Sequence, residues 1–502
     1  MPLNRRQALR RLSATLGTAG GSTLAAACQQ RPARADAVRG DWALGYRSVD
    51  QERYQARVAI EGDWPRTLDG AFYRNGPALH DIGDFRYRHW FDGDGLVQRF
   101  AAGEGRLSHQ AALVQTAKRR QERALGRAAL PAFGTVPPNG VGVTSADDLN
   151  PANISVLAHH ERLFALWEAG SPHELDPDTL ETRGVTEFSD DAAGLPFSAH
   201  PKVEADGTLW NFGYSGGELL VLWHLDSTGR VKRLKPLRIE NVGMPHDFVV
   251  TERYLVFLLA PLHRNPDADL ETASFLDLHR WYPDRATRVV IVRKSDLELE
   301  QVVELPAQWV FHFGNAYDDG RGIVRFDAAR SPSPEILTQS FRSVMAGHWH
   351  VPPAVRWTEY RVDLNARRAD ESLLLDDLEC EFPRIDPRQV ARHHDHVWML
   401  AGTPGQASPG GLNQVLRIDR RSDTVDRYVY GPEYMVEEHT VVTPTASKQR
   451  FLLGTALNLE QRRTELHLFD ADALAAGPRA RAVLPYAMPL GFHGTYRESP
   501  RA

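Results

Sequence analysis

Histidines are the residues of this sequence best suited to hold a metal ion, and 20 of the 502 residues are histidine. Two short clusters have the spacing of metal ligands: His348 with His350, and His394 with His396 and the adjacent His393. Residues two apart on a strand share a face, so an H-x-H pair can supply two ligands. Both clusters lie in charged or proline-rich sequence without a fixed partner, which favours solvated loops.

Four other histidines each lie at the edge of an apolar run, beside proline, phenylalanine or glycine: His200, His246, His312 and His493. They are too far apart in the sequence to form a local motif. Taken alone, they favour four separate buried or corner histidines. A shared metal site would require a fold that brings four remote segments to one point.

Short apolar, β-branched or aromatic runs recur from about residue 40 onward, between clusters of Gly, Asp and Pro. Examples are "GTLWNFGYSGGELLVLWHL", "HDFVVTERYLVFLLAP" and "TRVVIVRK". This pattern predicts an all-β chain of many antiparallel strands, with one domain over residues 38–502. Residues 108–130 are expected to be helical or irregular instead. No strict internal repeat indicates a propeller.

The composition is that of a globular protein, with 42% hydrophobic residues and a formal net charge of −6. We find no basic stripe, so a nucleic-acid partner is not expected. The two cysteines are Cys28 and Cys380. If Cys28 belongs to an export segment, the mature domain has neither an internal disulfide nor a cysteine-based metal site.

Residues 1–37 are predicted to be a twin-arginine export signal with its linker. Arg5 and Arg6 precede a modestly apolar stretch that ends in small residues before Cys28. The expected location is the periplasm. The sequence leaves open whether the chain is simply cleaved there or becomes lipid-anchored through Cys28. No other segment approaches about 18 uninterrupted apolar residues, so the mature protein is expected to be soluble or peripheral.

A series of motifs from about residue 50 to the end resembles the carotenoid cleavage oxygenases, a family that includes stilbene-cleaving oxygenases. They include "GAFYRNGPALH", "HWFDGDGLVQRF", "FSAHPKVE", "MPHDFVVTERYLVF", "FHFGNAYDD", "ECEFPRIDPR" and "LPYAMPLGFHGTY". The resemblance implies a seven-bladed β-propeller, with a loop and helix cap over an axis that bears one Fe(II) per chain. In this family four histidines from separate blades bind the iron, and the matching positions are His200, His246, His312 and His493.

The family also uses three glutamates, each paired with one of three ligand histidines. A carboxylate that accepts the second ring N–H of a ligand imidazole fixes its orientation and tautomer. Glu168 and Glu381 match two of these positions. The third is assigned to Glu438, with Glu437 as the alternative, because "VEEHTVVTP" contains an extra residue. His439 beside them is expected to be exposed and not a ligand.

Aromatic residues adjoin these positions: Trp167, Phe311 and Phe382. Core packing explains any one of them, but together they predict a hydrophobic substrate passage. Ile154 occupies a position where many members of the family have threonine. It keeps the bulk beside one open iron position and loses the hydroxyl group. "WFDGDG" lacks the carboxylate spacing of a calcium site and is interpreted as a structural turn.

The resemblance implies an Fe(II) dioxygenase that cleaves a conjugated C=C bond of a carotenoid or apocarotenoid with O2. The expected partners are O2 and a hydrophobic conjugated substrate, with peripheral membrane contact left open. One alternative is cleavage of stilbene-type phenolics, because Lys118 lies near the lysine of phenol-binding members, although a solvated lysine explains it equally well. The other alternative is a relative that binds or isomerises a hydrophobic ligand without cleaving it.

Overall fold

The computed structural model describes residues 41–499, apart from residues 215, 270–271, 403–410 and 446. The chain divides into two units, Met1–Ala35 and Asp36–Ala502. The first unit lies outside the described residues, as do Cys28 and the whole predicted export signal, so export and lipid attachment stay predictions. None of the helices in the described part has the length and apolar character that a membrane crossing requires.

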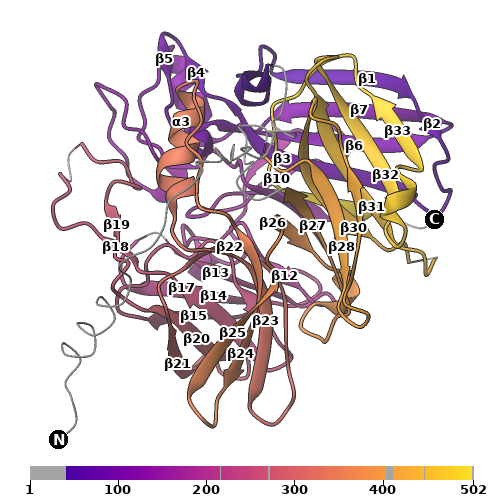
Figure 1. Cartoon of the computed structure of the whole chain (residues 1–502). Helices are drawn as coiled ribbons and strands as arrows, with labels where there is room; N and C mark the ends of the chain where they lie inside the picture. The colour runs from indigo at the N-terminus through magenta and orange to yellow at the C-terminus, as the bar shows by residue number, and fades with distance from the viewer. Residues whose placement is uncertain (1–40, 215, 270–271, 403–410, 446, 500–502) are drawn as a thin grey trace, which may run out of the picture. The chain divides into compact units, whose positions relative to one another are not determined.

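Within the second unit, antiparallel strands form a seven-bladed β-propeller, as the family resemblance implies (Figure 1). Each blade is a sheet of four or five strands. The first blade consists, in hydrogen-bonded order, of β1 (Arg53–Ala59), β7 (Arg106–Leu113), β6 (Asp94–Gly103), β3 (Gly70–Leu79) and β34 (Gly494–Glu498). In the same order, the second consists of β11 (Thr182–Val185), β10 (His173–Leu175), β9 (Arg162–Leu166) and β8 (Ser155–His159). The third consists of β12 (Lys202–Val203), β13 (Leu209–Gly213), β14 (Leu219–Leu225) and β15 (Val231–Arg238), and the fourth of β16 (Val249–Val250), β17 (Tyr254–Leu259), β20 (Thr287–Arg293) and β21 (Leu299–Leu305).

The other three blades follow the same pattern. The fifth blade consists of β22 (Trp309–Asp318), β23 (Ile323–Ser331), β24 (Arg356–Asp363) and β25 (Arg368–Leu375). The sixth consists of β26 (Glu379–Arg384), β27 (His396–Gly402), β28 (Gln414–Asp419) and β29 (Thr424–Val429). The seventh consists of β2 (Glu61–Gly62), β33 (Ala480–Val483), β32 (Arg463–Asp470), β31 (Phe451–Asn458) and β30 (Tyr434–Val442).

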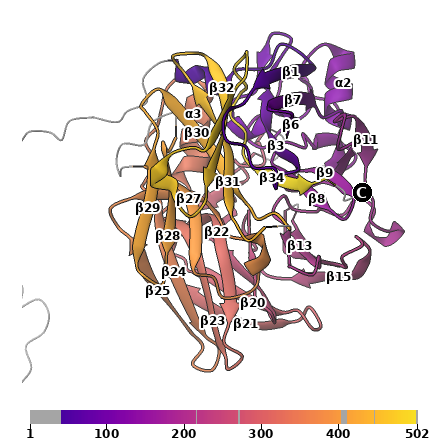
Figure 2. The ribbon, with the colours of Figure 1, turned by 90° about the vertical axis from the view of Figure 1, so that its right-hand side faces the viewer.

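Strands from the two ends of the described chain close the ring. β34, near the C-terminus, pairs antiparallel with β3, from Gly70 opposite Glu498 to Arg74 opposite Gly494. The yellow β34 accordingly lies among the indigo N-terminal strands in Figure 2. In return, β2 pairs with β33 of the last blade. The C-terminal segment is therefore an integral strand of the propeller and not a fraying tail.

Part of the chain outside the blades forms the expected cap of loops and short helices, in which α3 (Phe341–Met345) packs on the π-helical turn η5 (Ile336–Ser340) and on the 3-10 turns η1 (Trp42–Tyr46) and η2 (Trp90–Asp92). Helix α2 (Ala117–Leu125) packs on η3 (Ala146–Leu149), whereas η7 (Leu474–Ala476) contacts the outer strands β28 and β29. The other elements outside the blades are the hairpins β4–β5 (Asp81–Ile82 and Phe85–Arg86) and β18–β19 (Leu262–Arg264 and His279–Trp281) and the 3-10 turns η4 (Asp190–Ala192) and η6 (Pro387–Gln389).

Residues 108–130 are only partly helical, because their first part completes strand β7. Helix α2 begins where the Thr116 hydroxyl accepts a hydrogen bond from Arg119 N–H. It ends at Gly126, whose φ of 66° is the left-handed conformation typical of a helix C-terminus.

Candidate metal centre

The four predicted histidines converge on one point, although they come from different blades. His200 and His246 lie just before β12 and β16, His312 is within β22, and His493 directly precedes β34. Their ligand atoms all lie within 4.8 Å of one another. The Nε2 atom of His246 is 3.0 Å from that of His200 and 3.3 Å from that of His312. The structure thus assembles the cluster that sequence spacing alone could not indicate.

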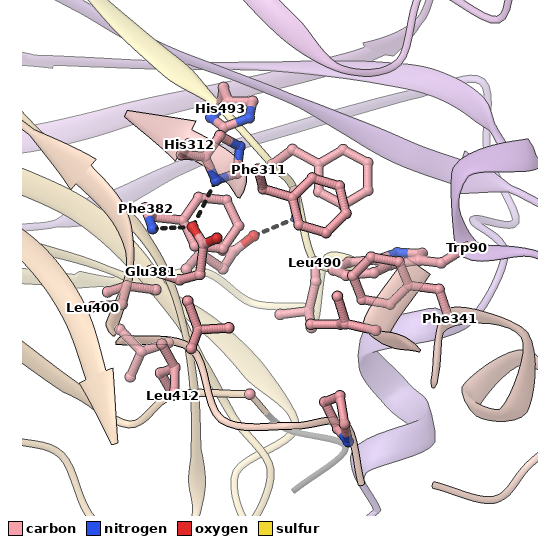
Figure 3. Close-up of a pocket in the computed structure, with 18 of the residues that line it drawn as sticks. Trp90, Phe311, His312, Phe341, Glu381, Phe382, Leu400, Leu412, Leu490 and His493 are labelled. Atoms are coloured by element: carbon pink, nitrogen blue, oxygen red, sulfur yellow. Dashed lines mark hydrogen bonds and ion pairs between the residues drawn. The ribbon is translucent and has the colours of Figure 1, made fainter. Parts of the chain in front are cut away.

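Three of these histidines turn their other ring nitrogen to a carboxylate. His246 Nδ1 lies 2.7 Å from Glu168, His312 Nδ1 lies 2.6 Å from Glu381, and His493 Nδ1 lies 2.9 Å from Glu438. Figure 3 shows Glu381 bridging His312 and the backbone of Phe382. The contacts of His312 and His493 are hydrogen bonds, whereas Glu168 lies close to His246 without hydrogen-bond geometry. A proton held on Nδ1 by a carboxylate leaves Nε2 with a free lone pair, which is the tautomer that binds a metal.

This donor set fits a divalent transition metal. With metal–nitrogen bonds of about 2.1 Å, two ligands at right angles lie about 3.0 Å apart, which matches the spacing of the Nε2 atoms. Nitrogen lone pairs that converge this closely repel each other unless a cation lies between them. Burial lowers the pKa of His493 to about 3, so its imidazole is neutral at neutral pH, as a ligand must be. Burial also opposes the charge on His312, but the neighbouring Glu381 outweighs it and raises the pKa of His312.

Glu438, the residue assigned to the third carboxylate, contacts His493, whereas Glu437 does not. The pairing of β30 with β31 shifts register between Val436 and His439. Both glutamates lie in this bulge, which accounts for the extra residue in the motif. Glu437 instead accepts a hydrogen bond from Gly491 N–H and forms a buried ion pair with Arg74. It therefore holds the backbone two residues before His493.

Sequence reasoning missed Arg384, which binds the same carboxylate as His493. Its Nε and Nη2 atoms lie 2.8 and 2.6 Å from the two oxygens of Glu438. Burial alone would raise the pKa of Glu438, but Arg384 and His493 outweigh it and hold the pKa well below its ordinary value. The position of Arg384, three residues after Glu381, was the only available signal.

His439 is buried, with 4% of its surface exposed, so the expectation that it is exposed was wrong. Strand β30 is buried on both faces from Met435 to Val442, because neighbouring blades pack against it. His439 hydrogen-bonds Tyr430 and the backbone carbonyl of Glu437, and it takes no part in the four-histidine cluster.

The expectation that the other histidine clusters lie in solvated loops without a fixed partner was wrong. His394 is buried against Asp327 of β23. His396 begins strand β27 and contacts Asp419, and His350 contacts Glu335. In the "WFDGDG" turn, Asp92 accepts hydrogen bonds from Gly134 and Thr135 and thereby ties the turn to the cap.

We expect Glu381→Gln to lower metal affinity by about 10–100-fold. Glutamine can still accept from His312 Nδ1, but it lacks the charge that orients the imidazole and makes it more basic. The measurement is competition between the protein and a chelator of known affinity for the same metal. The exposed Glu304 of β21 offers a matched Glu→Gln control that should change nothing. Unchanged affinity in Glu381→Gln would show that this carboxylate does not support a ligand.

Two apolar cavities adjoin the cluster. Cavity A, of about 150 Å³, is bounded by His312 and His493 and by the apolar side chains labelled in Figure 3, including Trp90, Phe341, Leu400 and Leu412. Cavity B, of about 290 Å³, is bounded by cap residues such as Phe133 and Phe275. Phe91, Ile154 and His246 line both cavities.

The structure places the predicted substrate residues on these walls. Phe311 and Phe382 line cavity A, Trp167 lines cavity B, and Ile154 lines both. Phe382 has a φ of 54°, a backbone conformation that is uncommon for residues other than glycine.

Lys118 is fully buried and lines neither cavity, so it is not the solvated lysine of a basic run. Its ammonium group lies 2.9 Å from Asp94 and 2.9 Å from Glu122, and over the ring of Tyr87. Because the ammonium group is paired with these carboxylates, it is not available to bind a phenol.

Lys118→Met is expected to lower the free energy of unfolding by about 3 kcal/mol, because it removes the buried cation between the carboxylates of Asp94 and Glu122. The denaturant midpoint measures this, with exposed Lys232→Met as the control. Wild-type stability combined with weaker binding of phenolic stilbenes alone would instead indicate that Lys118 contacts substrate.

Comparisons with known proteins agree with this geometry. The sequence model of the family described as RPE65, retinal pigment epithelial membrane protein, matches residues 46–498. The apocarotenoid-15,15'-oxygenase of Synechocystis sp. is 29% identical over 91% of this chain and 96% of its own length. The lignostilbene-alpha,beta-dioxygenase isozyme III of Sphingomonas paucimobilis is 28% identical over 88% of this chain and 94% of its own.

A solved structure shows the same likeness in three dimensions. Cobalt-substituted Synechocystis ACO superimposes with a TM-score of 0.83 at 28% identity, covering 91% of this chain and 98% of that one. A match over nearly the whole described chain, in both sequence and fold, establishes common descent. This chain therefore belongs to the RPE65 and carotenoid cleavage oxygenase family.

Proposed function

We propose that this protein is a non-haem dioxygenase that uses one Fe(II) per chain and O2 to cleave a conjugated C=C bond of an apocarotenoid or carotenoid. The products would be two carbonyl compounds, each of which takes one oxygen atom of O2. The observation that carries the proposal is the position of the four-histidine cluster between two apolar cavities, where an extended alkene could pass beside the ligands.

Different residues of the chain would bind the metal, orient its ligands and position the substrate. The four histidines would hold the ion, and the carboxylates of Glu168, Glu381 and Glu438 would orient three of them. Iron bound there would supply the binding and activation of O2. Ile154 and the aromatic walls would hold the alkene beside the cluster and exclude water from it.

In the described part of the chain, the walls of both cavities lack a cation that could bind a phenolate, which favours a polyene over an ionised phenol. Neither cavity is lined by a lysine or arginine among the described residues, and the ammonium group of Lys118 is occupied by Asp94 and Glu122. Stilbene cleavage is the second candidate, because the lignostilbene dioxygenase is nearly as similar to this chain as the apocarotenoid oxygenase.

The test is aerobic incubation of the iron-loaded protein with a panel of apocarotenals and stilbenes under ¹⁸O₂. Products are reduced to alcohols at once, so that exchange with water does not erase the label, and are then identified by mass spectrometry. Dioxygenase cleavage predicts ¹⁸O in both fragments of an apocarotenal. Label in both fragments of a stilbene alone would favour the second candidate. Stoichiometric iron without any cleavage product would favour a binding or isomerising relative.

A further inference from the structure

Cavity A contains one buried carboxylate that the metal centre does not use. Three glutamates line this cavity: Glu379, Glu381 and Glu437. Glu381 is bound by His312 and the backbone N–H of Phe382, and Glu437 by Gly491, Arg74 and Thr455. Glu379 is 4% exposed, and its Oε2 atom has no hydrogen-bond partner among the described residues.

The surroundings of Glu379 compensate its charge only in part. The nearby Arg356 donates a hydrogen bond to the carbonyl of Leu378, and no ion pair joins it to Glu379 among the described residues. Burial raises the pKa of Glu379, and a hydrogen bond from the backbone of Val355 and the charge of Arg356 do not fully offset this effect. Buried polar atoms are normally paired, and Glu379 lines cavity A, so a ligand in that cavity can supply the missing partner of its Oε2 atom.

Strand β26 aims Glu379 into the same cavity as the metal centre. Glu379, Cys380 and Glu381 pair in regular register with Gly402, Ala401 and Leu400, and the register shifts only after Glu381. Glu379 and Glu381 therefore share a face of the strand, about 6.6 Å apart along it. A group bound by Glu379 would lie in cavity A, one strand repeat from the carboxylate that orients His312.

We propose that Glu379 is a specificity residue that accepts a hydrogen bond from a hydroxyl group on the end ring of the substrate. The inference rests on the proposed function, because it takes the ligand of cavity A to be the alkene. The chemistry required is one O–H donor on an otherwise apolar ring, which a hydroxylated apocarotenoid or a hydroxystilbene could supply. Trp90 on the wall of the same cavity also has an unpartnered N–H and could donate to a ring oxygen.

The test is equilibrium binding without O2, measured by quenching of tryptophan fluorescence. Two matched pairs serve as probes: a hydroxystilbene with the methylstilbene of the same shape, and an apocarotenal with and without a ring hydroxyl. In at least one pair, the wild-type protein should bind the hydroxylated member about 10–100-fold more tightly. The pair that shows the preference identifies whether the bound ring belongs to a stilbene or to an apocarotenoid.

Glu379→Leu should abolish this preference while it keeps or improves affinity for the member without the hydroxyl. Glu379→Gln retains an acceptor oxygen and should keep part of the preference, and exposed Glu304→Leu should keep all of it. Equal wild-type affinities within both pairs would overturn the proposal, and that comparison needs no variant to fold. An unchanged preference in Glu379→Leu would overturn it as well.

The experiments distinguish failure of the Glu379 assignment from failure of the proposed function. A preference that depends on Glu379, without any cleavage product, would support this assignment and contradict the proposed function. If the protein cleaved the compounds with and without the hydroxyl and bound both equally tightly, the result would support the proposed function and contradict the role of Glu379.

Discussion

His246→Ala is expected to leave the purified protein without bound metal. The Nε2 atom of His246 lies close to those of both His200 and His312, so its loss removes a ligand from the middle of the cluster. The substitution also leaves Glu168 facing an empty space. We expect a loss of affinity well beyond the 10–100-fold that follows from losing a supporting carboxylate. Metal content per chain, measured by mass spectrometry after dialysis against a weak chelator, tests this.

The matched control is His393→Ala, because the side chain of His393 is 61% exposed. It should retain the wild-type metal content. His200→Ala should behave like His246→Ala, which separates loss of a ligand from damage to the wall of cavity B. A His246→Ala protein that still holds one metal ion per chain would show that the four-histidine cluster is not the metal site.

The fold and the histidine cluster could be predicted to different degrees for physical reasons. Alternation of apolar and polar residues reports which face of a strand is buried, so the all-β class follows from the sequence itself. The meeting of His200 with His493 is a property of ring closure, which no local pattern encodes. Only the resemblance to a family indicated that these histidines share a site.

Bulges explain why the carboxylates that orient the ligand histidines were harder to predict than the histidines. His312, Glu381 and Glu438 each lie at a shift of strand register, in β22, β26 and β30. A bulge changes which side chains face the axis, so simple alternation fails at the positions that matter most. The choice between Glu437 and Glu438 stayed open in the sequence for this reason, and the contribution of Arg384 could not be seen.

Buried charges were the other limit. Lys118 and His439 both stand in polar sequence that is typical of exposed segments. Lys118 is paired with Asp94 of strand β6 and with Glu122, one turn further along its own helix α2, and His439 is paired with Tyr430, which lies between β29 and β30. The i,i+4 spacing of Lys118 and Glu122 can be read in the sequence, but the contacts with Asp94 and Tyr430 cannot.

A chain that ends at Pro489 is expected to lose both its metal and much of its stability. The truncation removes His493 and with it strand β34, which closes the ring against β3. It also removes Phe492, which packs on Trp90 at a ring separation of 4.6 Å and on Phe91 at 5.2 Å. Burial of one such side chain contributes about 1.5–3 kcal/mol, so the loss of the whole segment should lower the denaturant midpoint sharply.

His493→Ala separates the two roles of this segment. Strand β34 remains, and Glu438 keeps its ion pair with Arg384, so the variant should fail to hold metal but should unfold near the midpoint of the metal-free wild-type protein. Metal content and denaturant midpoint, measured on both proteins, should therefore dissociate in His493→Ala and fall together in the truncated chain. If His493→Ala kept its metal, the loss in the truncated chain would come from an open ring and not from a missing ligand. If instead the truncated chain kept the wild-type midpoint, β34 would not be the strand that holds the propeller closed.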